Sequence, residues 1–244
     1  MSAVLKARSL SKSFGGLDAV KKLSFDLDQG EILALIGPNG AGKTTIFNLL
    51  TGFIPPDRGR VLLGDREITG LLPHRICRLG LVRTFQLVRP FLAISVLDNV
   101  MVGTLLRIKS IREAKAKARE IIDLVGLARY QDLEAGGLPL PLRKRLELAK
   151  ALATDPQVLL LDEVMAGLTP TEVDRLIGLI REINSRGVTI LLIEHVMRGV
   201  MALSHRVIVI NYGCLIAQGP PQEVVCDEQV IEAYLGREFV DAQG

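Results

Sequence analysis

Short apolar runs with the length of β-strands recur in the first and last thirds of the chain. Residues 31–36 (EILALI) are almost continuously apolar, which is typical of a strand buried on both faces of a parallel sheet. Further short strands are predicted at 60–63, 81–85, 158–161, 188–193 and 207–210. Between residues 23 and 27 apolar and polar residues alternate, which predicts a strand with one buried face.

Helical patterns dominate the middle of the chain. Residues 111–125 place six apolar side chains along one face of a predicted helix, and residues 142–154 predict a second one. Ser95 and Asp98 have the spacing of a helix N-cap with an acid three residues later. The segment 169–172 (TPTE) predicts the start of another helix, with Thr169 as the cap and proline at the first helical position.

Strands that alternate with helices indicate an α/β fold with a mainly parallel sheet and an antiparallel β portion near the N-terminus. We expect a single domain spanning residues 1–244. Its core would comprise 1–86 and 156–244, and an inserted helical subdomain would cover about 87–155.

Composition narrows the class of protein. Hydrophobic residues make up 48% of the 244 residues and the mean hydropathy is +0.32, yet no apolar run approaches the ~20 residues of a membrane span. The first ten residues lack the apolar core of a signal peptide, so we expect a cytosolic chain. A net charge of +3 and 4% aromatic residues argue against a nucleic-acid binder. The three cysteines have no metal-ligand spacing and are expected to be reduced packing residues.

A phosphate-binding loop follows the apolar run at 31–36. Residues 37–44 (GPNGAGKT) fit G-x-x-x-x-G-K-[ST] between a predicted strand and a predicted helix. Glycines let successive N–H groups point at phosphate oxygens, Lys43 would reach the β- and γ-phosphates, and the Thr44 hydroxyl would hold Mg²⁺. The predicted nucleotide-binding residues are Gly37, Pro38, Asn39, Gly40, Ala41, Gly42, Lys43, Thr44 and Thr45.

Polar residues end three of the other predicted strands. Asp162 and Glu163 follow the run at 158–161, at the edge where open α/β sheets bind ligands. Asp162 is predicted to anchor Mg²⁺, and Glu163 to orient or deprotonate the attacking water. His195 could contact the γ-phosphate and Glu163, and the Gln86 amide could sense the γ-phosphate or Mg²⁺. The predicted catalytic residues are therefore Lys43, Gln86, Glu163 and His195, and the metal ligands Thr44, Gln86 and Asp162.

In combination and in this order, the GPNGAGKT loop, Gln86 in RTFQ, the LLLDE strand and His195 resemble the ATP-binding subunit of an ABC transporter. The likeness covers nearly the whole chain and implies a RecA-like P-loop NTPase core that uses ATP and Mg²⁺. It also implies that Phe14 stacks on adenine. The segments RTFQLVRPF and SVLDNVMVG further resemble importers of branched-chain amino acids and their relatives.

The resemblance implies partners and a place in the cell. Such subunits work with a second ATPase subunit and two transmembrane permease subunits, and indirectly with a solute-binding protein. They are peripheral proteins of the cytoplasmic face of the inner membrane. Residues 89–92 (RPFL) are a candidate contact with the permeases, although an ordinary packed loop explains them equally well.

One segment departs from the family pattern. Residues 138–142 read Leu-Pro-Leu-Pro-Leu where the family has the signature Leu-Ser-Gly-Gly-Gln, whose donors bind the γ-phosphate of the opposite subunit's ATP. Pro139 replaces the hydroxyl donor and Pro141, expected at the first helical position, replaces a backbone donor. A second departure is Thr169, where the family usually has aspartate. We therefore expect a heterodimer in which only one ATP site is complete.

The three cations Arg143, Lys144 and Arg145 are unexpected at the start of a helix, because they oppose its dipole. The partner's nucleotide phosphates could compensate them. Alternatively, they could be solvated or pair with acids across an interface.

Other functions remain open. The cargo could be urea, amides or aromatic acids rather than branched-chain amino acids. The chain could instead be an ABC ATPase that acts on ribosomes or DNA, although such proteins usually carry a second cassette or a long coiled coil. It could also be a regulatory nucleotide-binding subunit, which the prolines favour and the intact Lys43, Asp162 and Glu163 oppose.

Overall fold

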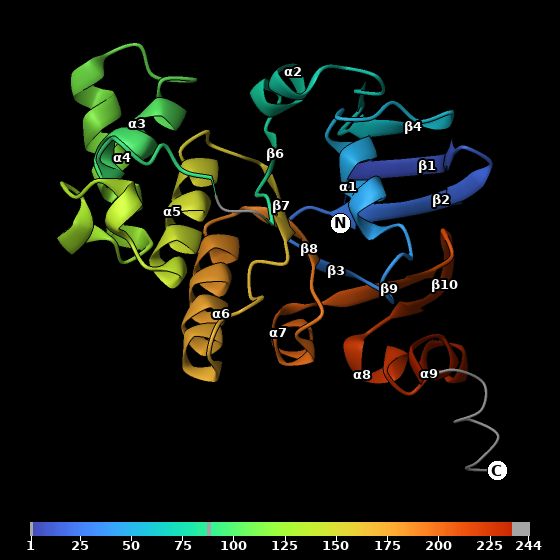
Figure 1. Cartoon of the computed structure of the whole chain (residues 1–244). Helices are drawn as coiled ribbons and strands as arrows, with labels where there is room; N and C mark the ends of the chain where they lie inside the picture. Colours follow the sequence, from blue (N-terminus) through green and yellow to red (C-terminus); the bar gives the residue numbers. More distant parts are fainter. Residues whose placement is uncertain (1, 87–88, 236–244) are drawn as a thin grey trace.

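A computed structural model describes residues 2–86 and 89–235 (Figure 1). The strands of one sheet are, in spatial order, β2 (Leu17–Asp28), β1 (Ala3–Phe14), β4 (Arg58–Leu63) and β5 (Arg66–Glu67). Those of the second sheet are β10 (Cys214–Gly219), β9 (Arg206–Asn211), β3 (Ile32–Ile36), β8 (Thr189–Ile193), β7 (Val158–Asp162) and β6 (Leu81–Arg83). The α-helices are α1 (Lys43–Leu50), α2 (Pro73–Arg78), α3 (Val96–Thr104), α4 (Ile111–Leu124), α5 (Leu140–Leu152), α6 (Pro170–Ser185), α7 (Met197–Leu203), α8 (Pro221–Val224) and α9 (Glu228–Leu235).

The second sheet is parallel except for its edge strand β10. Strand β3 pairs in parallel with β8 and β9, β8 pairs in the same sense with β7, and β7 with β6. Every residue of β3, β7 and β8 is buried, because helices or the other sheet cover both faces. The predicted α/β class is confirmed, and so is the antiparallel portion at the N-terminus.

Strand β2 is longer than the alternating pattern at 23–27 predicts, and its antiparallel neighbour β1 was not predicted as a strand. The pairing of β1 with β2 changes register at several points, between Ala3 and Leu5 and between Ala7 and Leu10 among others. Each irregularity shifts the inward-facing positions by one residue, so the period-two signal breaks up along the strands.

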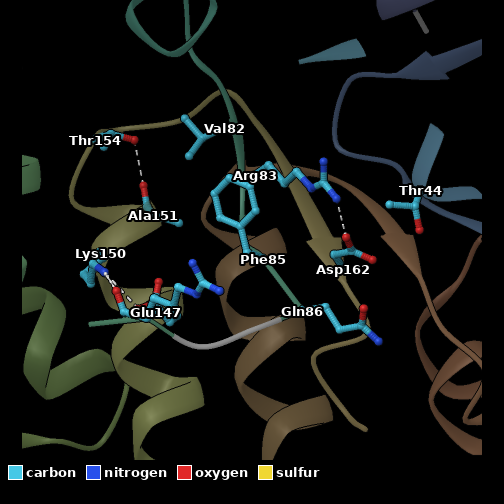
Figure 2. A pocket seen from close by; sticks show the side chains of 11 residues that line it. Thr44, Val82, Arg83, Phe85, Gln86, Glu147, Lys150, Ala151, Thr154 and Asp162 are labelled. Atoms are coloured by element: carbon cyan, nitrogen blue, oxygen red, sulfur yellow. Dashed lines mark hydrogen bonds and ion pairs between the residues drawn. The ribbon is translucent and has the colours of Figure 1, made fainter. Parts of the chain in front are cut away.

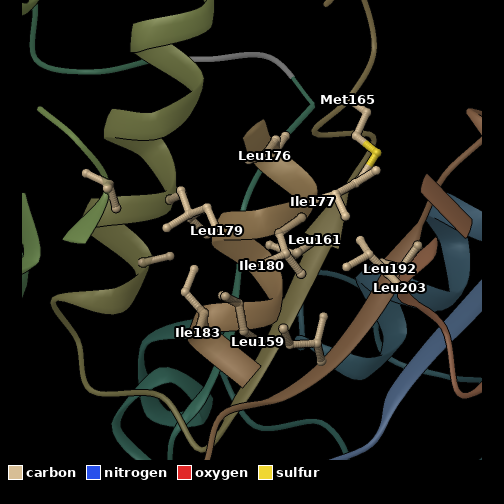
Figure 3. Packing of buried hydrophobic residues seen from close by; sticks show 14 of the residues in the cluster. Leu159, Leu161, Met165, Leu176, Ile177, Leu179, Ile180, Ile183, Leu192 and Leu203 are labelled. Carbon is tan, nitrogen blue, oxygen red and sulfur yellow. The ribbon is translucent and has the colours of Figure 1, made fainter. Parts of the chain in front are cut away.

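Side chains alternate between two hydrophobic clusters on opposite faces of the parallel sheet. Leu159 and Leu161 belong to one cluster, in which they pack with Ile180 of α6 (Figure 3). Leu160, between them in sequence, belongs to the other cluster with Phe47 of α1. Because β3, β8 and β7 pair in parallel, their carboxyl ends lie at the same edge of this sheet.

Helices α3, α4 and α5 pack against one another at one side of the molecule (Figure 1). The predicted face of α4 is correct at Ala114, Ala118 and Ile122, which are buried, and wrong at Ile111, whose exposed fraction is 60%. Ser95 accepts a hydrogen bond from the Asp98 N–H, as its capping role requires. Cys226 is exposed, so the expected packing role is wrong for that cysteine, and all three thiols are free.

No helix in the parts of the chain that the structure describes combines the length and the apolarity needed to cross a membrane.

Candidate nucleotide-binding site

The predicted phosphate loop connects β3 to α1, and three of its glycines have positive φ angles that other residues rarely adopt. Gly37, Gly40 and Gly42 have φ angles of 154°, 80° and 106°. A Cβ on Gly37 would lie 2.1 Å from the carbonyl oxygen of Ile210, and one on Gly42 would lie 2.4 Å from that of Ala19. The loop therefore needs glycine both for its conformation and for its close approach to neighbouring backbone.

The loop borders a cavity of about 580 Å³, within the size range of small-molecule sites. Its lining comprises residues 39–45, residues 16–19 and Lys21 of the β1–β2 hairpin, Glu163 and Tyr212. Lys43 Nζ donates to the carbonyl oxygens of Gly37 and Pro38, at 2.7 and 2.9 Å. Burial lowers the pKa of Lys43, while the negative charges of Glu163 and Asp162 oppose this. Backbone N–H groups at a helix start, together with a lysine, form an anion-binding arrangement.

Asp162 is the last residue of β7 and forms a buried ion pair that the sequence analysis missed. Arg83 Nη2 lies 2.5 Å from Asp162 Oδ2, and the two side chains are 6% and 4% exposed (Figure 2). Arg83 Nη1 also donates to Asn48 Oδ1 at 2.6 Å. The rings of Phe47 and Phe85 flank the guanidinium at 5.4 and 5.2 Å. The only sequence feature that pointed to this ion pair was the position of Arg83, which lies near the end of a predicted strand, three residues before Gln86.

The predicted strand 81–85 is too long, and Gln86 does not close it. Strand β6 ends at Arg83, and Thr84 N still donates to Leu160 O at 2.9 Å. The hydroxyl of Thr84 then accepts from Asp162 N at 3.2 Å, in place of the carbonyl that a longer strand would offer. The backbone therefore leaves the sheet before Gln86.

The structure brings Gln86, Glu163 and His195 together from three separate segments. Gln86 Nε2 donates to Glu163 Oε2 at 2.6 Å, and His195 Nδ1 lies 3.9 Å from the same oxygen. Glu163 itself has a left-handed backbone, with φ 48°. Such a conformation costs about 1–3 kcal/mol and persists where the surroundings enforce it.

Thr44, Gln86 and Asp162 line a second cavity, of about 620 Å³, next to Arg83 and Phe85 (Figure 2). They offer a hydroxyl, an amide oxygen and a carboxylate. These are hard oxygen donors of the type that Mg²⁺ prefers, so the donor set fits that ion.

Phe14 ends β1 and is about half exposed. Lys12 Nζ lies 5.5 Å from the centre of its ring. The hairpin lining of the loop cavity begins two residues later, at Gly16. Adenine stacking on Phe14 stays a prediction.

The proline-rich segment at 138–142 is well accommodated by the fold. Pro139 is the N-cap of α5, which begins at Leu140, so Pro141 occupies the second helical position rather than the first. The prediction of a helix start at 142 is wrong because α5 begins two residues earlier. A proline is tolerated in the first turn, where N–H groups have no helical partner.

The three cations after the prolines bond to backbone carbonyl oxygens. Arg143 donates to Leu138 O and Gly136 O, both at 2.6 Å. Arg145 donates to Val125 O at 3.4 Å, and Lys144 donates to carbonyl oxygens in the loop after Glu163. All three side chains are partly buried. The sequence did not predict these carbonyl acceptors, and the pairing of the cations with acids across an interface stays a prediction.

Thr169 caps α6 as predicted. Glu172 N donates to the Thr169 hydroxyl, and Glu172 Oε2 accepts from Thr169 N at 2.8 Å, which completes a capping box. The bond to Thr169 N lowers the pKa of Glu172.

Comparison with known proteins places these features in a family. Residues 20–166 match the family model described as ABC transporter, and residues 214–240 match the model described as branched-chain amino acid ATP-binding cassette transporter. The chain is 41% identical to the high-affinity branched-chain amino acid transport ATP-binding protein LivG of Escherichia coli strain K12, over 96% of this chain and 98% of LivG. It is 36% identical to the lipopolysaccharide export system ATP-binding protein LptB of Acidithiobacillus ferridurans, over 98% and 99% of the two chains.

Solved structures agree. The ADP conformation of MJ1267, an ATP-binding cassette of an ABC transporter, superposes with a TM-score of 0.88 at 30% identity. The match covers 97% of this chain and 100% of MJ1267. With the phosphate loop and the strand-end acids at one sheet edge, these likenesses lead to one conclusion: the chain belongs to the ABC transporter family, as one of its ATP-binding cassettes.

Proposed function

We propose that this chain binds and hydrolyses Mg-ATP and thereby powers an ABC importer of branched-chain or other hydrophobic amino acids. The observation that carries the proposal is that the phosphate loop shares one cavity with Asp162 and Gln86 and another with Glu163, which Gln86 and His195 contact, at one edge of the parallel sheet. Ligands of open α/β sheets bind at this edge.

In this mechanism the loop N–H groups hold the β- and γ-phosphates. Lys43 exchanges its bonds with Gly37 and Pro38 for phosphate oxygens. Thr44, Gln86 and Asp162 would hold Mg²⁺, which when bound would supply positive charge to the developing transition state. Glu163 orients the attacking water and accepts its proton, and His195 and Gln86 keep that carboxylate in place.

The proposed cargo rests on the relatives. LivG and the BraF protein of Pseudomonas aeruginosa, named for branched-chain amino acid transport, are 41% and 40% identical to this chain. The C-terminal match to a branched-chain cassette model favours the same class over urea, amides or aromatic acids.

The proposed partners are a second, different ATPase subunit and two permeases at the cytoplasmic face of the inner membrane, served by a solute-binding protein. Pro139 and Pro141 carry no N–H, so Leu140 retains the one backbone donor of residues 139–141. A partner's γ-phosphate facing this helix start would lack most of its donors, and losing one such donor costs about 3–4 kcal/mol of transition-state stabilisation. The complete site would combine this chain's phosphate loop with an intact signature from the partner.

The proposed contact with the permeases is the segment 89–92. Phe91 and Leu92 are each 54% exposed, while Pro90 is buried. The buried Asn99 fixes this segment, because it accepts from Phe91 N at 2.8 Å and donates to Phe91 O at 2.9 Å.

The test is ATP hydrolysis by the transporter complex that co-purifies with this chain from a membrane extract, compared with the chain alone. Lys43→Ala and Glu163→Gln in the complex should abolish most turnover, while Glu67→Gln on the exposed β5 should leave it unchanged. The isolated chain should hydrolyse ATP slowly. Equal rates for the chain and the complex would refute the asymmetric dimer, and full activity of Glu163→Gln would refute the proposed mechanism.

A further inference from the structure

The loop that carries Glu163 is gripped by a lysine from another helix. Lys144 Nζ, near the start of α5, donates to the carbonyl oxygens of Glu163 at 3.4 Å, Val164 at 3.0 Å and Ala166. An ammonium group has three N–H donors and no acceptor, so these three carbonyl oxygens satisfy it completely. The half-buried lysine thereby regains the hydrogen bonds that burial removes.

A glutamate holds the same loop from the sheet. Glu194 follows directly after β8, its side chain is almost fully buried, and its Oε1 accepts from Met165 N at 2.8 Å. Burial raises the pKa of Glu194, while the bond from Met165 N–H lowers it. Burial lowers the pKa of Lys144, and the charges of Glu194 and Glu163 oppose that change. Together the two side chains bind three carbonyl oxygens and one amide N–H of residues 163–166.

This loop needs to be held. Glu163 has the left-handed φ of 48°, which a residue with a Cβ adopts at a cost, and its N–H donates to Ile193 O at 2.9 Å. If the loop relaxed, the Glu163 side chain would leave its contact with Gln86. The contacts from Lys144 and Glu194 are therefore placed to preserve the orientation of Glu163.

We propose that Lys144 and Glu194 are positioning residues for ATP hydrolysis, which clamp the backbone of residues 163–166 and aim the Glu163 carboxylate at the attacking water. The proposal rests on the proposed function, in which Glu163 activates that water. Lys144 belongs to α5, the helix that begins with the two prolines. A displacement of that helix start would therefore move Glu163 of the same chain, although the prolines leave only the Leu140 N–H as a backbone donor among residues 139–141.

The test separates binding from turnover. Lys144→Met keeps the length of the side chain and removes its charge and donors. In the complex it should lower kcat at least tenfold, while calorimetry on the full chain should give a Kd for Mg-ATP within twofold of wild type. Lys144→Arg, which can still donate to carbonyl oxygens, should recover at least a third of the turnover. Arg145→Met is the matched control from the same cation run and should have wild-type kcat.

Hydrogen exchange supplies a readout that does not depend on activity. In folded Lys144→Met the amides of residues 165–168 should exchange at least tenfold faster, with those of β3 unchanged. If the methionine variant does not fold, Glu194→Ala removes the acceptor for Met165 N–H and should lower kcat at least fivefold at unchanged Kd. Turnover within twofold of wild type, or no recovery with arginine, would overturn the clamp. Failure of the wild-type chain to bind Mg-ATP would instead overturn the proposed function.

Discussion

Removal of the Arg83 guanidinium should destabilise this protein more than most single substitutions. In Arg83→Met the Asp162 carboxylate, 4% exposed, loses the cation 2.5 Å away, and Asn48 Oδ1 loses its donor. Breaking one side of a buried ion pair costs about 3–5 kcal/mol, because an uncompensated charge stays in the interior. Folded domains have a total stability of about 5–15 kcal/mol, so the variant should lose a large part of it.

The measurement is urea unfolding of wild type, Arg83→Met, Asp162→Asn and the double variant. The double variant removes both charges and should be more stable than Arg83→Met, with a coupling energy of about 1–3 kcal/mol. Arg58→Met, an exposed arginine of β4, serves as the control and should change stability by less than about 0.5 kcal/mol. A loss below about 1 kcal/mol for Arg83→Met, or additive effects in the double variant, would refute the argument.

Three further predictions concern stability. Ile180→Ala should cost about 2–5 kcal/mol in urea unfolding, because this fully buried side chain packs in the cluster beneath β7. Asn99→Ala should lower the free energy of unfolding by about 1–3 kcal/mol and speed hydrogen exchange at Phe91, because the Asn99 side chain accepts a hydrogen bond from the Phe91 N–H. Unchanged exchange at Phe91 would contradict this prediction. Glu194→Gln should gain stability relative to wild type as pH rises from 4.5. Because the pKa of Glu194 is raised in the folded state, its contribution to stability is complete at low pH and is lost as the pH rises through that pKa. A difference in the free energy of unfolding between Glu194→Gln and wild type that does not change with pH would refute this prediction.

Much of the site could be predicted from the sequence because its chemistry lies in short motifs. The glycine spacing of 37–44 already specifies a loop that only glycine can form, and the positive φ angles of Gly37, Gly40 and Gly42 bear this out. The acids at 162 and 163 follow an apolar run, which predicts their position at a strand end. Strand 31–36 was found because full burial on both faces leaves a continuous apolar signal.

The sequence missed the partners of charged side chains. The Arg83–Asp162 pair joins residues 79 apart, and Lys144 reaches carbonyl oxygens about 20 residues away. No periodic pattern marks such contacts, and a carbonyl acceptor leaves no trace in the sequence because every residue has one. The cations at 143–145 were consequently expected to be compensated by anions or solvent, and the backbone carbonyl oxygens that accept their hydrogen bonds could not be predicted.

The sequence by itself determined the fully buried strands of the parallel sheet, the phosphate loop and the identity of the acids at the site, since each depends on residues close to one another in the chain. Tertiary structure decided how those acids are held: Arg83 on Asp162, and Lys144 and Glu194 around the backbone that carries Glu163. The physical reason is that apolar periodicity records which face of an element is buried. Which polar groups meet across the interior is settled when the elements pack.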